Sequence, residues 1–216
     1  MISPVKIGLA SLYRMDCMEF MASLPDKAFD LAIIDPPYRD VNSPTQSMRK
    51  VGGKMTSFGL KPTKDYFFEL KRVSANQIVW GGNNFELPPT NCFICWDKAC
   101  YIPNYSQCEL AWTSFDSVAK LFYYAWTGLS DGIVGRNKTE KRIHPTQKPV
   151  KLYEWLLTNY AKPGQRILDT HLGSMSSVIA ANNLGFELTG CELDEDYFKA
   201  GCDRAMQATA QSRMFA

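Results

Sequence analysis

Two periods of apolar residues alternate along the chain. Short apolar runs of the kind found in buried strands cover residues 31–34, 77–80, 93–96, 110–113, 121–125, 166–168 and 188–191. Other apolar residues recur at helical spacing. They predict helices from Asp16 to near Pro25, over residues 66–73, 152–160 and 178–184, and from Asp194 onward. Asp16 and Glu19 have the spacing of a capping box, which supports the first of these helices.

This order of strands and helices favours an α/β fold. We expect a single domain over residues 1–216, with a mostly parallel central sheet and helices on both faces. Two polar connections have no predicted structure of their own. They cover residues 39–64 and much of 113–142, and long loops in compact domains are often functional.

Composition narrows the class of protein only slightly. The chain has 216 residues, is 45% hydrophobic and carries a net charge of +2, so a nucleic-acid-binding surface would have to be local. Its first residues do not have the pattern of a secretion signal. No apolar run approaches the roughly 20 residues that cross a bilayer. We therefore expect a cytoplasmic protein with no membrane partner.

The cysteines raise the question of a zinc site. Cys92 and Cys95 form a CxxC pair, and Cys100 and Cys108 follow. However, the pair lies in an apolar run that predicts a strand, and residues three apart on a strand face opposite sides. We expect buried thiols and no metal.

The first candidate site follows the strand at 31–34 directly, in Asp35-Pro36-Pro37-Tyr38. Ligands bind at the carboxyl ends of strands in open parallel sheets. The Asp35 carboxylate and the Pro36 carbonyl could accept both hydrogens of a planar NH2 group, which would make its nitrogen nucleophilic. Tyr38 could stack on the base that carries this group. The alternative is a turn that only ends a strand.

The second candidate site lies at residues 166–192. A strand ends at Asp169, the turn 170–177 is rich in glycine and serine, and the next strand ends near Glu192. An acid at this spacing suits ribose hydroxyls, so the unit could hold a nucleoside-bearing cofactor. The G-x-G-x-x-G fingerprint of dinucleotide-binding proteins does not occur here. A plain βαβ unit has the same pattern.

A third segment, residues 143–149, reads Ile-His-Pro-Thr-Gln-Lys-Pro. The Thr146 hydroxyl and the Lys148 ammonium could bind a carboxylate. Taken without its context, His144 is more often a structural residue than a catalytic one. The alternative is a proline-rich loop before a helix.

Together these segments resemble the amino-methylating DNA methyltransferases, in the permuted beta-class order. In that order the DPPY motif precedes an HPTQKP-like segment and then the cofactor-binding half, and the resemblance spans nearly the whole chain. It implies a Rossmann-like fold and a methyltransferase activity that depends on S-adenosylmethionine. The usual turn of the family reads Pro-Phe and then Gly-Ser-Gly. Here Thr170 and His171 replace the first pair, and Met175 replaces the last glycine, which has more backbone freedom.

The resemblance also implies roles for particular residues. The catalytic residues would be Asp35, Pro36, Pro37 and Tyr38. The cofactor-binding residues would be Asp16, Cys17, Asp35, His144, Thr146, Lys148, Asp169, Gly173, Ser174 and Glu192. The basic loop at 39–64 would contact DNA through Arg39, Arg49, Lys50, Lys54 and Lys61. Residues 113–142 leave room for only a small target-recognition region.

The reaction implied is methyl transfer from S-adenosylmethionine to the N6 amino group of a flipped adenine, leaving S-adenosylhomocysteine. Methylation of the cytosine N4 amino group needs the same acceptors and remains an alternative. Methylation of RNA or of a protein amide, and a catalytically silent binding module, are further alternatives. The enzyme would act as a monomer or homodimer in a bacterial or phage-infected cell.

Overall fold

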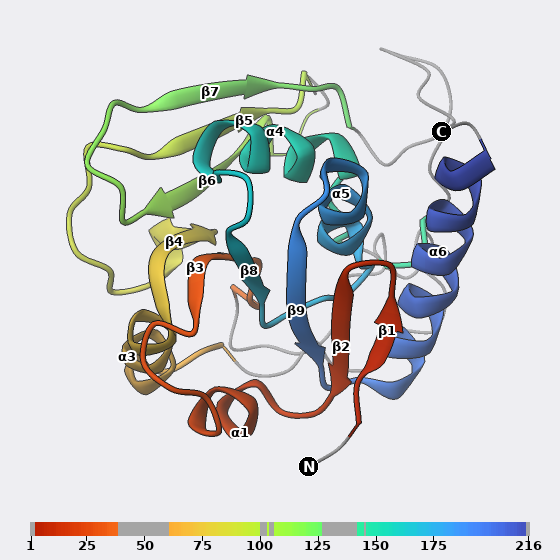
Figure 1. Ribbon diagram of the computed structural model, residues 1–216. Helices are drawn as coiled ribbons and strands as arrows, with labels where there is room; N and C mark the ends of the chain where they lie inside the picture. The colour runs from red at the N-terminus through yellow and green to blue at the C-terminus, as the bar shows by residue number, and fades with distance from the viewer. Residues whose placement is uncertain are drawn as a thin grey trace.

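A computed structural model describes residues 3–38, 61–99, 103, 106–126, 142–144 and 146–214. Within these residues, nine strands form one sheet in the order β1-β2-β9-β8-β3-β4-β6-β5-β7 (Figure 1). The strands are β1 (Val5–Ile7), β2 (Ala10–Arg14), β3 (Phe29–Ile34), β4 (Ser74–Trp80), β5 (Ile94–Asp97), β6 (Cys108–Thr113), β7 (Lys120–Tyr123), β8 (Arg166–Asp169) and β9 (Glu187–Glu192).

The five strands at the centre of the sheet, β2-β9-β8-β3-β4, are parallel. At one end β1 pairs antiparallel with β2, and at the other β6 pairs antiparallel with both β4 and β5. The mostly parallel α/β sheet that the sequence predicts is therefore confirmed. One consequence of the antiparallel pairing is that β6 begins at the edge where the parallel strands end.

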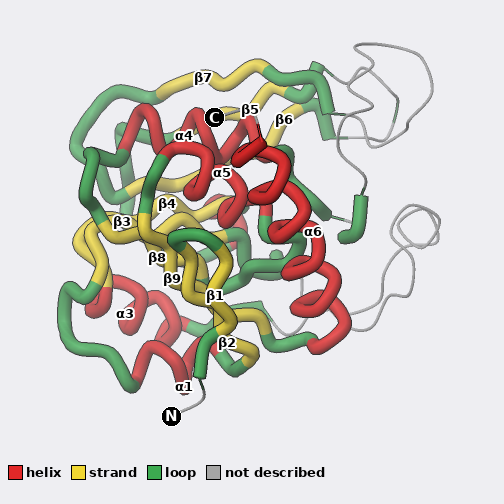
Figure 2. Tube along the Cα trace, turned by 45° about the vertical axis from the view of Figure 1, so that its right-hand side comes forward, coloured by secondary structure: helices red, strands yellow, loops and turns green. Residues whose placement is uncertain are grey.

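Helices cover both faces of the sheet, as expected (Figure 2). The helices are α1 (Cys17–Ala22), α3 (Lys64–Val73), α4 (Val150–Tyr160), α5 (Ser176–Leu184) and α6 (Glu195–Met214), with a short 3-10 turn η1 (Gly82–Asn84). Alternate residues of β3 explain the two layers. Ala32 and Ile34 pack with α1 and α3, whereas Leu31 and Ile33 pack with the cluster that contains α4, α5 and α6.

The sequence predicts the helices, and the strands from β3 onward, closely, with differences at some ends. The short strands β1 and β2 lie outside the predicted apolar runs. Asp16 caps α1 as expected, because its carboxylate accepts from the backbone N–H of Met18 at 2.8 Å and of Glu19 at 3.2 Å. The strand expected at 121–125 covers Lys120–Tyr123 instead. Lys64 is not part of the basic loop, because it begins α3.

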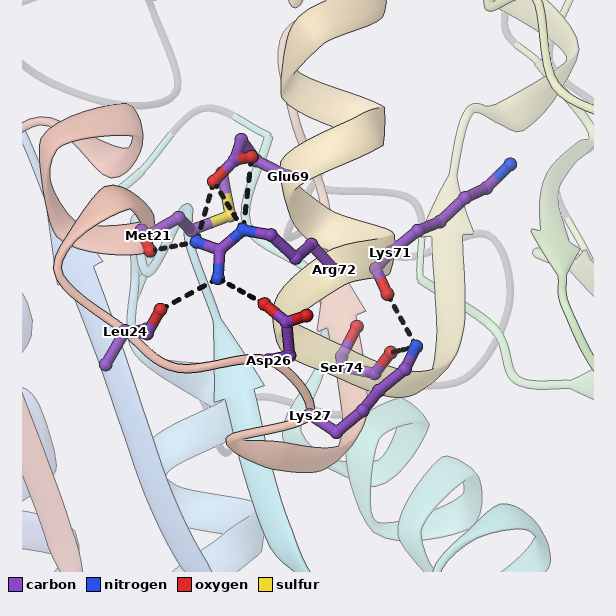
Figure 3. A network of polar contacts seen from close by, with 8 residues as sticks. All are labelled: Met21, Leu24, Asp26, Lys27, Glu69, Lys71, Arg72 and Ser74. Atoms are coloured by element: carbon purple, nitrogen blue, oxygen red, sulfur yellow. Dashed lines mark hydrogen bonds and ion pairs between the residues drawn. The ribbon is translucent and has the colours of Figure 1, made fainter.

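Arg72 joins the two helices on one face of the sheet (Figure 3). Its guanidinium donates to the carbonyls of Met21 and Leu24, each at 2.8 Å, and pairs with Asp26 and Glu69. These contacts tie α3 to the segment that follows α1. They lie where β3 and β4 begin, which is the edge opposite the candidate site.

Within the described residues, no helix is both long and apolar enough to cross a membrane.

Candidate active site

Four neighbouring parallel strands end at one edge of the sheet, and each end carries an acid. Asp16 follows β2, Glu192 ends β9, Asp169 ends β8 and Asp35 follows β3. Strand β3 pairs directly with β8, with Ala32 opposite Leu168. The catalytic motif and the cofactor turn predicted from the sequence therefore lie side by side, although about 130 residues separate them in the chain.

Both carboxylate oxygens of Asp35 are engaged. The Tyr38 hydroxyl donates to Oδ1 at 2.5 Å, and the Lys148 ammonium lies 2.6 Å from Oδ2. Burial, and then the charge of Asp35, raises the pKa of Tyr38 well above its ordinary value, so its hydroxyl stays protonated and donates. Asp35 is half-buried beside the buried Pro36.

Gly81 at the end of β4 makes room for the Tyr38 ring. Its φ is +63°, and a Cβ there would lie only 2.3 Å from the ring. The ring of Phe85 meets that of Tyr38 edge-on, with 6.4 Å between their centroids. Any side chain at position 81 would thus displace the aromatic ring of the motif.

Lys148 connects the three predicted segments. Its side chain is only 4% exposed and reaches Asp35, while its carbonyl accepts from the Ser176 hydroxyl at 2.7 Å. The sequence resemblance implies a role for Lys148 at the methionine end of a cofactor. Here its ammonium lies against the DPPY motif, 3.1 Å from the Tyr38 oxygen.

Sequence reasoning missed Glu109, whose Oε2 lies 3.0 Å from the Lys148 ammonium. Lys98, which follows β5, pairs with its other oxygen. Burial alone would raise the pKa of Glu109, but Lys148 and Lys98 lower it to about 2. Burial would lower the pKa of Lys148, but Asp35 and Glu109 raise it above its ordinary value. Both groups are therefore charged at neutral pH.

The sequence contained only a weak signal for Glu109, an acid just before an apolar strand. Because β6 runs antiparallel to β4, its first residues lie at the same edge as Asp35. Strand direction depends on distant pairing, so the pattern of the strand does not reveal this position.

On the other half of the edge, Glu192 holds the glycine- and serine-rich turn that follows Asp169. Its Oε2 accepts from Gly173 N–H at 2.8 Å, and its Oε1 accepts from Asp194 N–H at 3.0 Å. Burial raises its pKa. Strand β9 pairs with β2, so Glu192 and the half-buried pair Asp16-Cys17 occupy adjacent strand ends.

Asp169 stabilises the same turn through two hydrogen bonds. It is 1% exposed, and its Oδ2 accepts from the Ser177 hydroxyl at 2.6 Å while its Oδ1 accepts from His171 N–H at 3.0 Å. Burial raises its pKa to about 7. These contacts explain why an acid occupies position 169: its side chain fixes the conformation of the turn.

His144 and Thr146 lie beside the same turn. The His144 ring packs against Tyr197, with 4.3 Å between centroids, and Thr146 Oγ1 lies 3.1 Å from His144 Nδ1. Burial, with a contribution from Lys148, lowers the pKa of His144 to about 4, so the ring is neutral. The nearby Ser174 is buried, and its carbonyl accepts from Arg204 at 2.6 Å.

Some predicted residues cannot be placed in the site. Arg39, Arg49, Lys50 and Lys54 lie outside the described residues, as do Cys100 and residues 127–141 of the proposed recognition region. Lys61 is described, and its ammonium lies 5.6 Å from the centroid of the Phe85 ring. The described residues contain no group of three His, Cys, Asp or Glu side chains that could hold a metal.

A comparison with known families adds to this geometry. Residues 96–202 match the N6/N4 methylase family model, which is described as DNA methylase. The matched segment includes Glu109, Lys148, the turn at Gly173 and Glu192. Over these residues, about half of its length, the chain is similar to the N6/N4 DNA methylases.

The chain is also similar to individual proteins. It is 28% identical over 204 residues to an Escherichia coli K12 protein named "Putative methylase YubD", covering 88% of this chain and 87% of that protein. The solved M1.HpyAVI–SAM complex matches 90% of this chain and 98% of its own at 19% identity, with a TM-score of 0.58. The cytosine-N4-specific PvuII DNA methyltransferase matches 97% and 96% at 13% identity, also with a TM-score of 0.58. The two structures show a shared fold.

Proposed function

We propose that this protein is a DNA methyltransferase that transfers a methyl group from S-adenosylmethionine to the N6 amino group of adenine in DNA. One observation carries the proposal: the pairing of β3 with β8 puts Asp35 and the turn after Asp169 at the same edge of the sheet. Transfer between two bound molecules requires such adjacency, since most of the rate gain in a reaction with an already reactive donor comes from positioning.

The residues on the β2–β9 side fit the proposed cofactor. Asp16 and Glu192 supply carboxylates that can accept from amino and hydroxyl groups, and acids are suited to a cationic sulfonium. The buried Tyr197 hydroxyl, beside His144, has no hydrogen-bond partner among the described residues, so a polar atom remains for a ligand. Gly173, in the turn that follows Asp169, adopts a left-handed φ of +47°.

On the β3 side, the chain's own groups would prepare the target base. The Asp35 carboxylate and the Pro36 carbonyl would accept the amino hydrogens, which orients the nitrogen lone pair. The Tyr38 ring would hold the base by stacking, worth roughly 1–3 kcal/mol. When bound, S-adenosylmethionine supplies a sulfonium methyl group for direct transfer. No covalent adduct between protein and base is required.

Adenine is proposed because the resemblance links an acid at the first position of the motif to adenine and a serine to cytosine. To test this, DNA is incubated with the protein and S-adenosylmethionine, digested to nucleosides and analysed by mass. We expect N6-methyladenine. N4-methylcytosine would contradict the base assignment while supporting the reaction class, and unmodified DNA would contradict both.

Asp35→Ala tests the role of the motif. We expect kcat to fall at least about 100-fold, because the amino group would lose its orienting acceptor. Binding of S-adenosylmethionine, measured by calorimetry, should persist. Asp116→Ala, which removes an exposed acid far from this edge, is the control and should keep full activity. Equal turnover in the two variants would remove Asp35 from the mechanism.

A further inference from the structure

Lys148 lies in a largely buried cluster of charged side chains. Its ammonium is 2.6 Å from Asp35 Oδ2 and 3.0 Å from Glu109 Oε2, and Lys98 pairs with Glu109 Oε1. The Lys148 side chain is 4% exposed, that of Asp35 16% and that of Glu109 24%. Two acids and two lysines thus contact one another in a largely buried space, and the charge of Arg142 also acts on Glu109.

This cluster conflicts with the proposed reaction as long as it stays unchanged. The target amino group needs an acceptor oxygen of Asp35, yet the Tyr38 hydroxyl and the Lys148 ammonium engage both. A target amino group that takes the place of Lys148 at Oδ2 leaves the ammonium without this partner. A buried ammonium without a partner is strongly destabilised, so the displaced charge needs a second carboxylate.

Glu109 is placed to be that carboxylate. It precedes the buried strand positions of β6, and Lys98 holds its other oxygen, so its position is fixed from both sides. Its pKa of about 2 keeps it ionised, although burial opposes the charge. Lys148 already touches it and need not move far to pair with it alone.

We propose that Glu109 is a positioning residue that retains the Lys148 ammonium when the target amino group takes its place at Asp35. This inference rests on the proposed function, since it concerns how the same site admits its target. Glu109 acts through Lys148 and does not touch the base. Without Glu109, the ammonium stays on Asp35 and competes with the target.

The test compares Glu109→Gln with the conservative variant Glu109→Asp. We expect kcat for DNA methylation to fall tenfold or more in Glu109→Gln, which keeps the size of the side chain and removes its charge. In Glu109→Asp, most of that loss should be recovered, because a carboxylate remains for Lys148. A role in packing alone predicts the opposite order, since glutamine matches glutamate in size and aspartate does not.

The control is Glu69→Gln, which removes a carboxylate of similar exposure, 29%, from an ion pair with Arg72 at the opposite edge. It should keep kcat within about twofold of the wild type. The proposal is wrong if Glu109→Gln behaves like this control, or if Glu109→Asp is no more active than Glu109→Gln. Circular dichroism and thermal unfolding verify that each variant is folded.

A second measurement does not depend on methyl transfer. In Asp35→Asn, an amide replaces the carboxylate, and NMR of isotope-labelled lysine should show Lys148 still charged at pH 8. Adding Glu109→Gln should lower the pKa of Lys148 clearly. If Lys148 loses its charge in Asp35→Asn alone, Glu109 does not retain it. If instead the wild type methylates no DNA, the proposed function fails while this measurement still decides the role of Glu109.

Discussion

At the scale of single residues, Met175 shows how a local departure from the family pattern is accommodated. Its φ of +58° and ψ of +30° are left-handed, the conformation that a glycine would adopt without strain. The side chain is nonetheless completely buried, and it packs where Gly201 leaves space, since a Cβ there would lie 2.8 Å from Met175 Cγ. Burial offsets a backbone cost of about 1–2 kcal/mol.

This conformation predicts an unusual order of stability. Met175→Ala and Met175→Gly both lose the buried side chain, at a cost of about 2–5 kcal/mol. We expect Met175→Gly to be the more stable of the two by about 1 kcal/mol, because glycine relieves the left-handed strain. Urea unfolding measures the difference.

The matched control is Gln207, an exposed position inside α6. There the order should reverse, with Gln207→Ala more stable than Gln207→Gly by about 1 kcal/mol, as in ordinary helices. The same order at both positions would contradict the strain assigned to Met175.

At the scale of elements, the helices and strands follow from local pattern, but the contacts that join them do not. Tyr66, Phe67, Leu70 and Val73 form the predicted face of α3, and all four are buried. The contact between α3 and the end of α1 depends instead on Arg72, which lies on the other side of that helix and reaches two carbonyls in a distant segment. A basic residue in the last turn of a helix does not predict such a partner.

Arg72→Met should therefore lower Tm by several degrees, because the carbonyls of Met21 and Leu24 lose their donor. Arg72→Lys should recover only part of the loss, since one ammonium cannot reproduce the contacts of a planar guanidinium. Calorimetry gives Tm. The kcat of methyl transfer should change little in either variant, because this network lies at the edge away from the site. Full recovery by lysine would show that charge alone matters there.

At the scale of the whole molecule, the candidate site combines segments from both halves of the chain. Lys61 lies beside this site. Its ammonium lies over the Phe85 ring, and that ring contacts the ring of Tyr38. We propose that the basic segment ending at Lys61 contacts DNA next to the catalytic motif.

Replacing Lys50, Lys54 and Lys61 by glutamine should weaken DNA binding and reduce its dependence on salt. Each phosphate contact contributes about 0.9 to the slope of log K against log salt concentration, so the slope should fall by roughly 2–3. Fluorescence anisotropy at several salt concentrations measures it.

The control replaces the exposed Lys6, Lys162 and Lys199, which removes the same total charge elsewhere on the molecule. If the slope of log K against log salt concentration falls equally in both triple variants, net charge explains the binding and a local contact does not.

The sequence by itself determined the α/β class, the cap at Asp16, and the position of Asp35, Asp169 and Glu192 at strand ends. These features depend on neighbours a few residues apart, because periodicity and capping are local effects. Only the tertiary structure decided that β3 pairs with β8 and that β6 runs antiparallel, which brings Glu109 and Lys148 to Asp35. Pairing order and buried ion pairs depend on packing between distant segments, and local pattern does not encode which segments meet.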